Sequence, residues 1–191
     1  MGMSRTSHHL RLPGIGMRNI KTALAATLCA LLYLFIDRNP TFACIGAIFG
    51  LGNGLEDSWR NGGNRLFGTI IGGFLGMGLF WLYLKACPQA DNKILLLPLL
   101  FVGVVLLIIC SQFFRWPGAV QPGGVVLCII LYNTHPTAYI PYSLNRMLDT
   151  GIGVVVALCI NLLLPRERLE LWRTKLNLSK PTAAEVGEEE E

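Results

Sequence analysis

Residues 66–84 read LFGTIIGGFLGMGLFWLYL, a stretch without a single charged side chain. The hydrocarbon core of a bilayer is about 30 Å thick, and an α-helix needs roughly twenty mostly apolar residues to cross it. Arg65 comes directly before the stretch, at an end from which its long side chain can reach the polar headgroups. The stretch therefore predicts a transmembrane helix.

The composition of the whole chain agrees with this prediction. Of its 191 residues, 52% are hydrophobic and only 15% are charged, against about 25% charged residues in typical soluble domains. A soluble domain of this size has too little interior to bury so much apolar surface. The basic residues lie scattered between apolar runs, without the dense basic stripe that nucleic-acid binding needs. We therefore expect an integral membrane protein that contacts the lipid bilayer and no nucleic acid.

Five further apolar runs are candidates for transmembrane helices. They cover residues 20–36, 41–55, 94–114, 119–132 and 148–164. The second and fifth runs along the chain are short and rich in Gly, Pro or Asn. Together with residues 66–84, the runs predict an all-α integral membrane protein with six transmembrane helices.

The distribution of Lys and Arg orients the six helices, because cytoplasmic loops are enriched in both residues. With a cytoplasmic N-terminus, twelve of the sixteen basic residues fall on the cytoplasmic side. Dropping one short helix would place the two basic termini on opposite sides of the membrane. We therefore expect a cytoplasmic arm over residues 1–18 and a cytoplasmic tail over residues 166–191. In the tail, residues 166–178 can form a short amphipathic helix with Leu169, Trp172 and Leu176 on one face; a plain tail and a binding element are both open.

Two stretches of the chain resemble each other. Residues 64–72 read NRLFGTIIG and residues 145–153 read NRMLDTGIG, so Asn, Arg, Thr, Ile and Gly recur at the same offsets. Each lies at the start of the last apolar run of a three-helix unit, residues 19–85 and residues 92–165. Because each unit has an odd number of crossings, the two units have opposite orientations. The sequence therefore predicts two inverted three-helix repeats, an architecture in which substrate sites lie at the repeat interface.

Interruptions in the two short runs are candidates for a substrate path. Asn53 lies in the glycine-rich end of the second run, and Gln121 precedes a proline in the fifth. Asn133, twelve residues before Asn145, corresponds to Asn53, eleven residues before Asn64. Backbone groups freed at such breaks, and helix N-termini, can hold an anion. Close helix packing at the glycines is an equally good explanation.

Small residues also recur in the third helix. Gly68, Gly72 and Gly76 follow each other at the small-xxx-small spacing that lets two helices approach closely. We expect these glycines to pack against another helix, either within the chain or in a dimer.

Arg65 and Arg146 occupy equivalent places in the two repeats, at opposite membrane faces in the expected topology. They can be interface anchors, or they can attract an anion at the two mouths of a pathway. Asp149 lies one helical turn after Arg146 and can neutralise it or relay protons.

Sites for metals or catalysis are not apparent. The cysteines lack metal-ligand spacing, and the three histidines lie in polar segments without nearby Cys or carboxylate partners. We find no nucleophile–base set, phosphate loop or paired catalytic carboxylates. We expect no enzyme activity, no cofactor and no metal.

Several segments resemble those of a known group of membrane proteins. Residues 16–25 (GMRNIKTALA), 39–43 (NPTFA), 64–73 (NRLFGTIIGG) and the second Asn-Arg-x-x-x-Thr at 145–150 resemble the fusaric-acid-resistance-like (FUSC) or aromatic acid exporter superfamily. The likeness covers about residues 14–165. It implies a six-helix membrane domain that moves organic anions such as aromatic carboxylates. The expected direction is efflux, and the expected location is the bacterial plasma membrane.

The resemblance also implies a homo-oligomer, with a dimer favoured, and basic residues along the anion path. Two features differ from many relatives. Asn53-Gly54 stands where they have Gln-Pro, and a short tail follows where they carry a large cytoplasmic domain or a second membrane half. The alternative function is a membrane scaffold or assembly subunit that transports nothing.

Overall fold

The computed structural model describes residues 17–88 and 92–164, and helices are the only regular secondary structure in this part of the chain. The elements are α1 (Met17–Ile36), α2 (Thr41–Gly50), α3 (Leu55–Ala86), the 3₁₀ turn η1 (Lys93–Leu95), α4 (Leu96–Phe113), the 3₁₀ turn η2 (Pro117–Ala119), α5 (Val120–Asn133) and α6 (Tyr139–Leu163). The amphipathic helix expected in the tail lies outside the described residues, as does nearly all of the N-terminal arm.

Four helical segments are long and apolar enough to cross a membrane: Arg18–Ile36, Leu55–Ala86, Lys93–Phe113 and Tyr139–Leu163. The chain is thus a helical membrane protein. Helix α2 has ten residues, which is about 15 Å and half the thickness of the hydrocarbon core. For α2 and α5 the expected membrane crossings stay a prediction.

Helices α3 and α6 begin well before the apolar runs that predicted them, at Leu55 and Tyr139. The sequence-based starts were wrong because they followed hydropathy, and polar residues do not end a helix. Glu56 and Asp57 lie in the first turn of α3, where carboxylates are favourable beside the helix N-terminus. Pro141 lies in the first turn of α6, where proline is tolerated. The 32 residues of α3 extend about 48 Å, longer than the hydrocarbon core.

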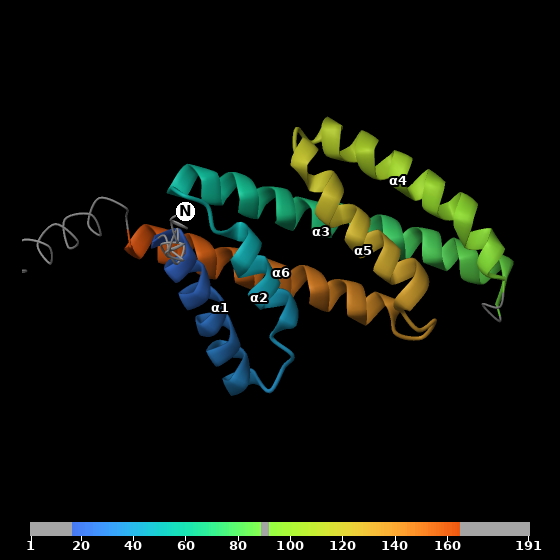
Figure 1. Ribbon diagram of the computed structural model, residues 1–191. Coiled ribbons are helices and arrows are strands. Elements are labelled where there is room, and N and C mark those ends of the chain that lie inside the picture. The colour runs from blue at the N-terminus through green and yellow to red at the C-terminus, as the bar shows by residue number, and fades with distance from the viewer. Residues whose placement is uncertain (1–16, 89–91, 165–191) are drawn as a thin grey trace, which may run out of the picture.

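The two long helices α3 and α6 lie antiparallel along each other and form the centre of the fold. Gly62 of α3 lies against Val154 of α6, and Gly73 lies against Met147. Helix α2 crosses α6, and α5 crosses α3 (Figure 1). Helix α1 packs against α2 and α6, whereas α4 packs against α3 and α5. Figure 1 shows α1 and α4 toward opposite ends of the α3–α6 pair.

Glycines bring α3 and α5 together. A Cβ on Gly72 would meet the backbone of Gly123, with the Gly123 Cα at 2.8 Å. A Cβ on Gly68 would meet Pro122 and Gly123 in the first turn of α5. A Cβ on Gly76 would meet the side chain of Ile130. Gly68, Gly72 and Gly76 therefore form one stripe on α3 that faces α5, and the helices touch through their backbones.

Glycines also bring α2 and α6 together. A Cβ on Gly153 would meet the carbonyl oxygen of Ala43, and a Cβ on Gly46 would lie 2.9 Å from the carbonyl oxygen of Thr150. Because backbone atoms form both surfaces, α2 is held at a fixed place on α6.

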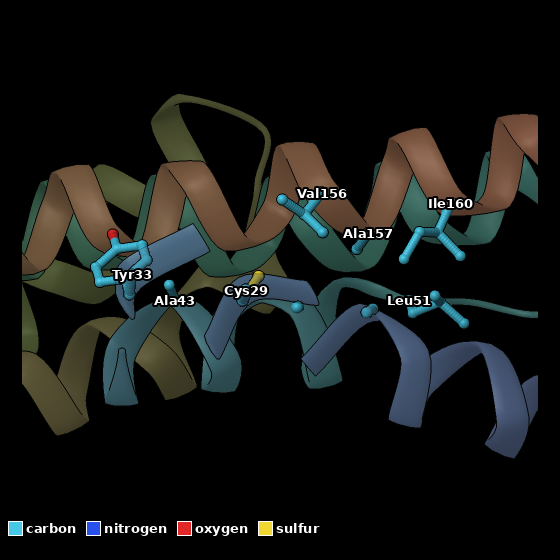
Figure 2. Packing of buried hydrophobic residues seen from close by; sticks show 9 residues of the cluster. Cys29, Tyr33, Ala43, Leu51, Val156, Ala157 and Ile160 are labelled. Carbon is cyan, nitrogen blue, oxygen red and sulfur yellow. The ribbon is translucent and has the colours of Figure 1, made fainter. Parts of the chain in front are cut away.

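Buried hydrophobic residues form two clusters. One joins α1, α2 and α6, and Figure 2 shows Ala157 and Ile160 of α6 facing the side chains of α1 and α2. The other joins α3, α4 and α5 around Phe80, Leu127 and Ile130. Large apolar side chains on the outer surface, such as Phe101 at 72% exposure, face outward where lipid would cover them.

Candidate functional site

A cavity of about 370 Å³ lies between α2, α3, η2 and α5. Its lining residues are Phe49, Asn61, Asn64, Arg65, Gly118, Gln121, Pro122 and Val125. Two of the predicted path residues, Arg65 of α3 and Gln121 of α5, both line this cavity. Asn61 and Asn64 were not predicted as site residues, because they lie in the polar stretch before the apolar run.

Arg65 supplies the positive charge of the cavity. It lies in the third turn of α3, and its Cζ is 4.9 Å from the centroid of the Phe49 ring. Its Nε is buried and has no hydrogen-bond partner, and no carboxylate of the described residues lies within ion-pair distance of it. A guanidinium carries five N–H donors arranged for carboxylate or phosphate. Arg65 thus has donors to offer an anion.

Three amide side chains line the same cavity as Arg65. Asn61 and Asn64 lie about one helical turn apart on α3. The side-chain amide of Asn64 packs so closely against Gly118 of η2 that a Cβ added at Gly118 would meet it. Gln121 reaches the cavity from the first turn of α5. Phe49 and Val125 add apolar wall. Such a mixture suits a ligand with an anionic head and an apolar body.

Arg146 lies near this cavity without lining it. The residue is 4% exposed, its Nη1 donates to the Tyr142 hydroxyl at 3.0 Å, and its Cζ is 4.1 Å from the Phe42 ring centroid. In the antiparallel register of α3 and α6 it lies about two turns, roughly 10 Å, from the level of Arg65. A role at the two mouths of a pathway stays a prediction.

Asp149 binds partners from α1 and from the turn that follows it. Its Oδ1 accepts a hydrogen bond from the Tyr33 hydroxyl at 2.7 Å and forms an ion pair with Arg38 at 3.0 Å. Arg38 also donates to Asn145 at 3.2 Å. The expectation that Asp149 neutralises Arg146 was wrong, because the α1–α2 turn brings Arg38 to the carboxylate instead. Proton relay by Asp149 stays a prediction.

The two remaining path candidates lie away from the cavity. Asn53 is exposed in the connection between α2 and α3, and Asn133 is the exposed last residue of α5. Neither lines the cavity.

A buried polar chain lies at the other end of α6, and sequence reasoning missed it. Lys21 of α1 donates to Asn161 of α6 at 3.1 Å, and Asn161 donates to Ser58 of α3 at 2.8 Å. The Ser58 hydroxyl also accepts the Gly52 N–H at 2.7 Å. The available signal was Asn161 within the apolar second half of α6, together with Lys21 close to the start of the first apolar run.

In the described part of the chain, no three His, Cys, Asp or Glu side chains lie close enough together to hold a metal ion. The six cysteines are free thiols.

Comparisons with known proteins give the chain a family context. The family model described as "Aromatic acid exporter family member 1" matches residues 14–164. A UPF0421 protein of Staphylococcus saprophyticus is 28% identical over 178 residues, covering 91% of this chain and 50% of the relative. A UPF0421 protein of Staphylococcus haemolyticus is 27% identical, covering 77% of this chain and 42% of the relative. A UPF0421 protein of Staphylococcus epidermidis is 25% identical, covering 87% of this chain and 48% of the relative. The chain spans about half the length of these curated relatives. No solved structure matches significantly.

Proposed function

Because this chain belongs to the aromatic acid exporter family, we propose that it is a membrane transporter or channel for organic anions such as aromatic carboxylates, working in efflux. The observation that carries the proposal is Arg65, a guanidinium on a membrane-spanning helix, without a carboxylate partner among the described residues, in a cavity lined by amides. A cation at the centre of a membrane-spanning helix is unfavourable by roughly 2.5–3.5 kcal/mol, and Arg65, which lies nearer the end of α3, carries part of that energy. A bound anion would offset that energy and fill the free donors.

The packing of the helices supports two inverted repeats as part of this proposal. If α1, α2 and α3 are exchanged with α4, α5 and α6, the contact of α3 with α5 becomes that of α6 with α2. The contact of α1 with α6 likewise becomes that of α4 with α3. The cavity then lies between elements of both repeats, since α2 and α3 belong to one and η2 and α5 to the other. Substrate sites of inverted-repeat transporters lie at such interfaces.

Individual residues support the same exchange. The backbone contact of Gly72 with Gly123 corresponds to that of Gly153 with Gly46. In addition, the turns before α2 and η2 each contain a non-glycine residue with positive φ, Asp37 at 52° and Arg115 at 61°. Such backbone is uncommon outside glycine, so its recurrence at matching places favours a common origin of the two halves.

We also propose a homo-oligomer, with a dimer favoured, in the bacterial plasma membrane and with both termini cytoplasmic. The outer seam of α3 and α6 carries an apolar groove of about 610 Å³, lined by residues that include Ile70, Phe74, Leu148, Ile152 and Val155. We propose that a second copy packs in this groove. The groove and the cavity have no lining residue in common, so each protomer of such a dimer would keep its own anion cavity. Light scattering of the purified protein in detergent tests the dimer, with twice the chain mass expected.

The test of transport is uptake of organic anions by liposomes that contain the purified protein. Phthalate and benzenesulfonate are suitable probes, since they stay charged and cross pure lipid slowly, and malate serves as a non-aromatic comparison. We expect uptake above that of protein-free liposomes, and loss of this uptake in an Arg65→Gln/Arg146→Gln double variant. The exposed Arg60 on the same helix provides the control Arg60→Gln.

If folded and correctly oriented protein moved none of these anions, the transport proposal would fail. Recovery of a stoichiometric protein partner in mild detergent would then favour the scaffold function.

A further inference from the structure

Phe49 occupies a special place at the cavity. It is one of the lining residues, its side chain is 62% exposed, and its ring lies under the guanidinium of Arg65. The backbone that carries it is fixed by close packing of α2 on α6. Gly46 packs on the backbone of Thr150, and a Cβ added at Gly50 would lie 3.5 Å from the Cβ of Ala157. The ring of Phe49 is therefore held beside the charge while much of its surface stays open.

Arg65 contacts the Phe49 ring through its guanidinium, and the N–H donors of the same group are what a carboxylate would bind. An aromatic ring binds a guanidinium over its flat face, whereas a carboxylate binds in the plane of its N–H fork. The two interactions use different parts of the group. The Phe49 ring therefore does not compete with a bound carboxylate, and its exposed surface lies next to where the body of that ligand would lie.

We propose that Phe49 is a specificity-determining residue that makes the cavity prefer aromatic carboxylates over saturated ones of equal charge and size. This inference rests on the proposed function, since it assumes that a carboxylate binds at Arg65. Offset or edge-to-face contact between two aromatic rings is stronger than the contact of a ring with a saturated body. That difference corresponds to about threefold to tenfold in affinity.

The test compares benzoate with cyclohexanecarboxylate, which have the same charge and similar size but differ in aromaticity. Binding of each acid to the purified protein in detergent is measured by isothermal titration calorimetry, where passive permeation through lipid plays no part. The variants are Phe49→Leu, which removes the ring, and Phe49→Tyr, which keeps it. Phe101→Leu is the control, because Phe101 lies on the outer surface of α4 at 72% exposure and away from the cavity.

The native protein and the Phe49→Tyr and Phe101→Leu variants should bind benzoate about threefold to tenfold more tightly than cyclohexanecarboxylate. In Phe49→Leu that ratio should fall toward one, chiefly through weaker benzoate binding. An unchanged ratio in Phe49→Leu, with both acids still bound, would overturn the role of Phe49 and leave the proposed function intact. Absence of binding by either acid to the folded native protein would overturn both.

Discussion

The backbone contact between Gly72 and Gly123 makes a sharp prediction about stability. A methyl group at Gly72 would meet the Gly123 backbone, which cannot rotate away as a side chain can. Overpacking of this kind destabilises a protein by about 1–3 kcal/mol, and the helix propensity of alanine recovers up to about 1 kcal/mol. We therefore expect Gly72→Ala to destabilise the protein by about 1–2 kcal/mol.

Gly78 provides the matched control on the same helix. A Cβ there meets nothing within 4 Å, so Gly78→Ala should be neutral or stabilising by up to about 1 kcal/mol. A change of 1 kcal/mol shifts the melting temperature of a chain this size by about 2–4 °C. Gly72→Ala should thus melt about 2–8 °C below the native protein in the same detergent, and Gly78→Ala should not. Equal melting temperatures for the two variants would refute the close α3–α5 contact.

Three further predictions concern the polar contacts and the topology. Asp149→Asn removes the ion pair with the half-exposed Arg38 and should destabilise the protein by about 1–2 kcal/mol, measured by thermal unfolding; an unchanged melting temperature would contradict the pairing. Asn161→Leu removes the hydrogen bonds that link Lys21 of α1 to Ser58 of α3 through Asn161, and should destabilise the protein by about 1–3 kcal/mol in the same assay. An unchanged melting temperature would mean that these hydrogen bonds do not form. The topology is tested in a variant whose six native cysteines are replaced by serine, because these free thiols would also react. A cysteine introduced there at position 93 should react with a membrane-impermeant maleimide in intact cells, while one at position 60 should not. The reverse pattern would contradict cytoplasmic termini.

Much of the fold could be predicted from local sequence. The apolar runs predicted the helices, because lipid requires long stretches without charge and every backbone group must be satisfied within the helix. The early starts of α3 and α6 were missed, since the polar turns before residues 66 and 148 lie where hydropathy carries no helical signal. The spacing of Gly68, Gly72 and Gly76 indicated a close helix contact, but spacing alone could not identify α5 as the partner.

The candidate site was only partly predictable. Arg65 and Gln121 were named because a basic residue at the end of an apolar run and a polar break are visible in the sequence. Asn64 entered only as part of the repeat, and Phe49 was not singled out, because an aromatic residue in an apolar run has no distinguishing local pattern. The pairing of Asp149 with Arg38 depends on the α1–α2 turn, which brings together residues far apart in the chain. A sequence neighbour, Arg146, was therefore the wrong expected partner.

The most direct test of the central claim is the rate of phthalate uptake by liposomes containing single variants of Arg65. Loss of a charged hydrogen-bonding partner corresponds to about 1.5–3 kcal/mol, or roughly tenfold to a hundredfold. Arg65→Gln should lower the rate by that factor, Arg65→Lys should retain part of it by keeping the charge, and Arg60→Gln should match the native protein. If Arg65→Gln transported phthalate as fast as the native protein, the cavity at Arg65 would not be the site through which the anion passes.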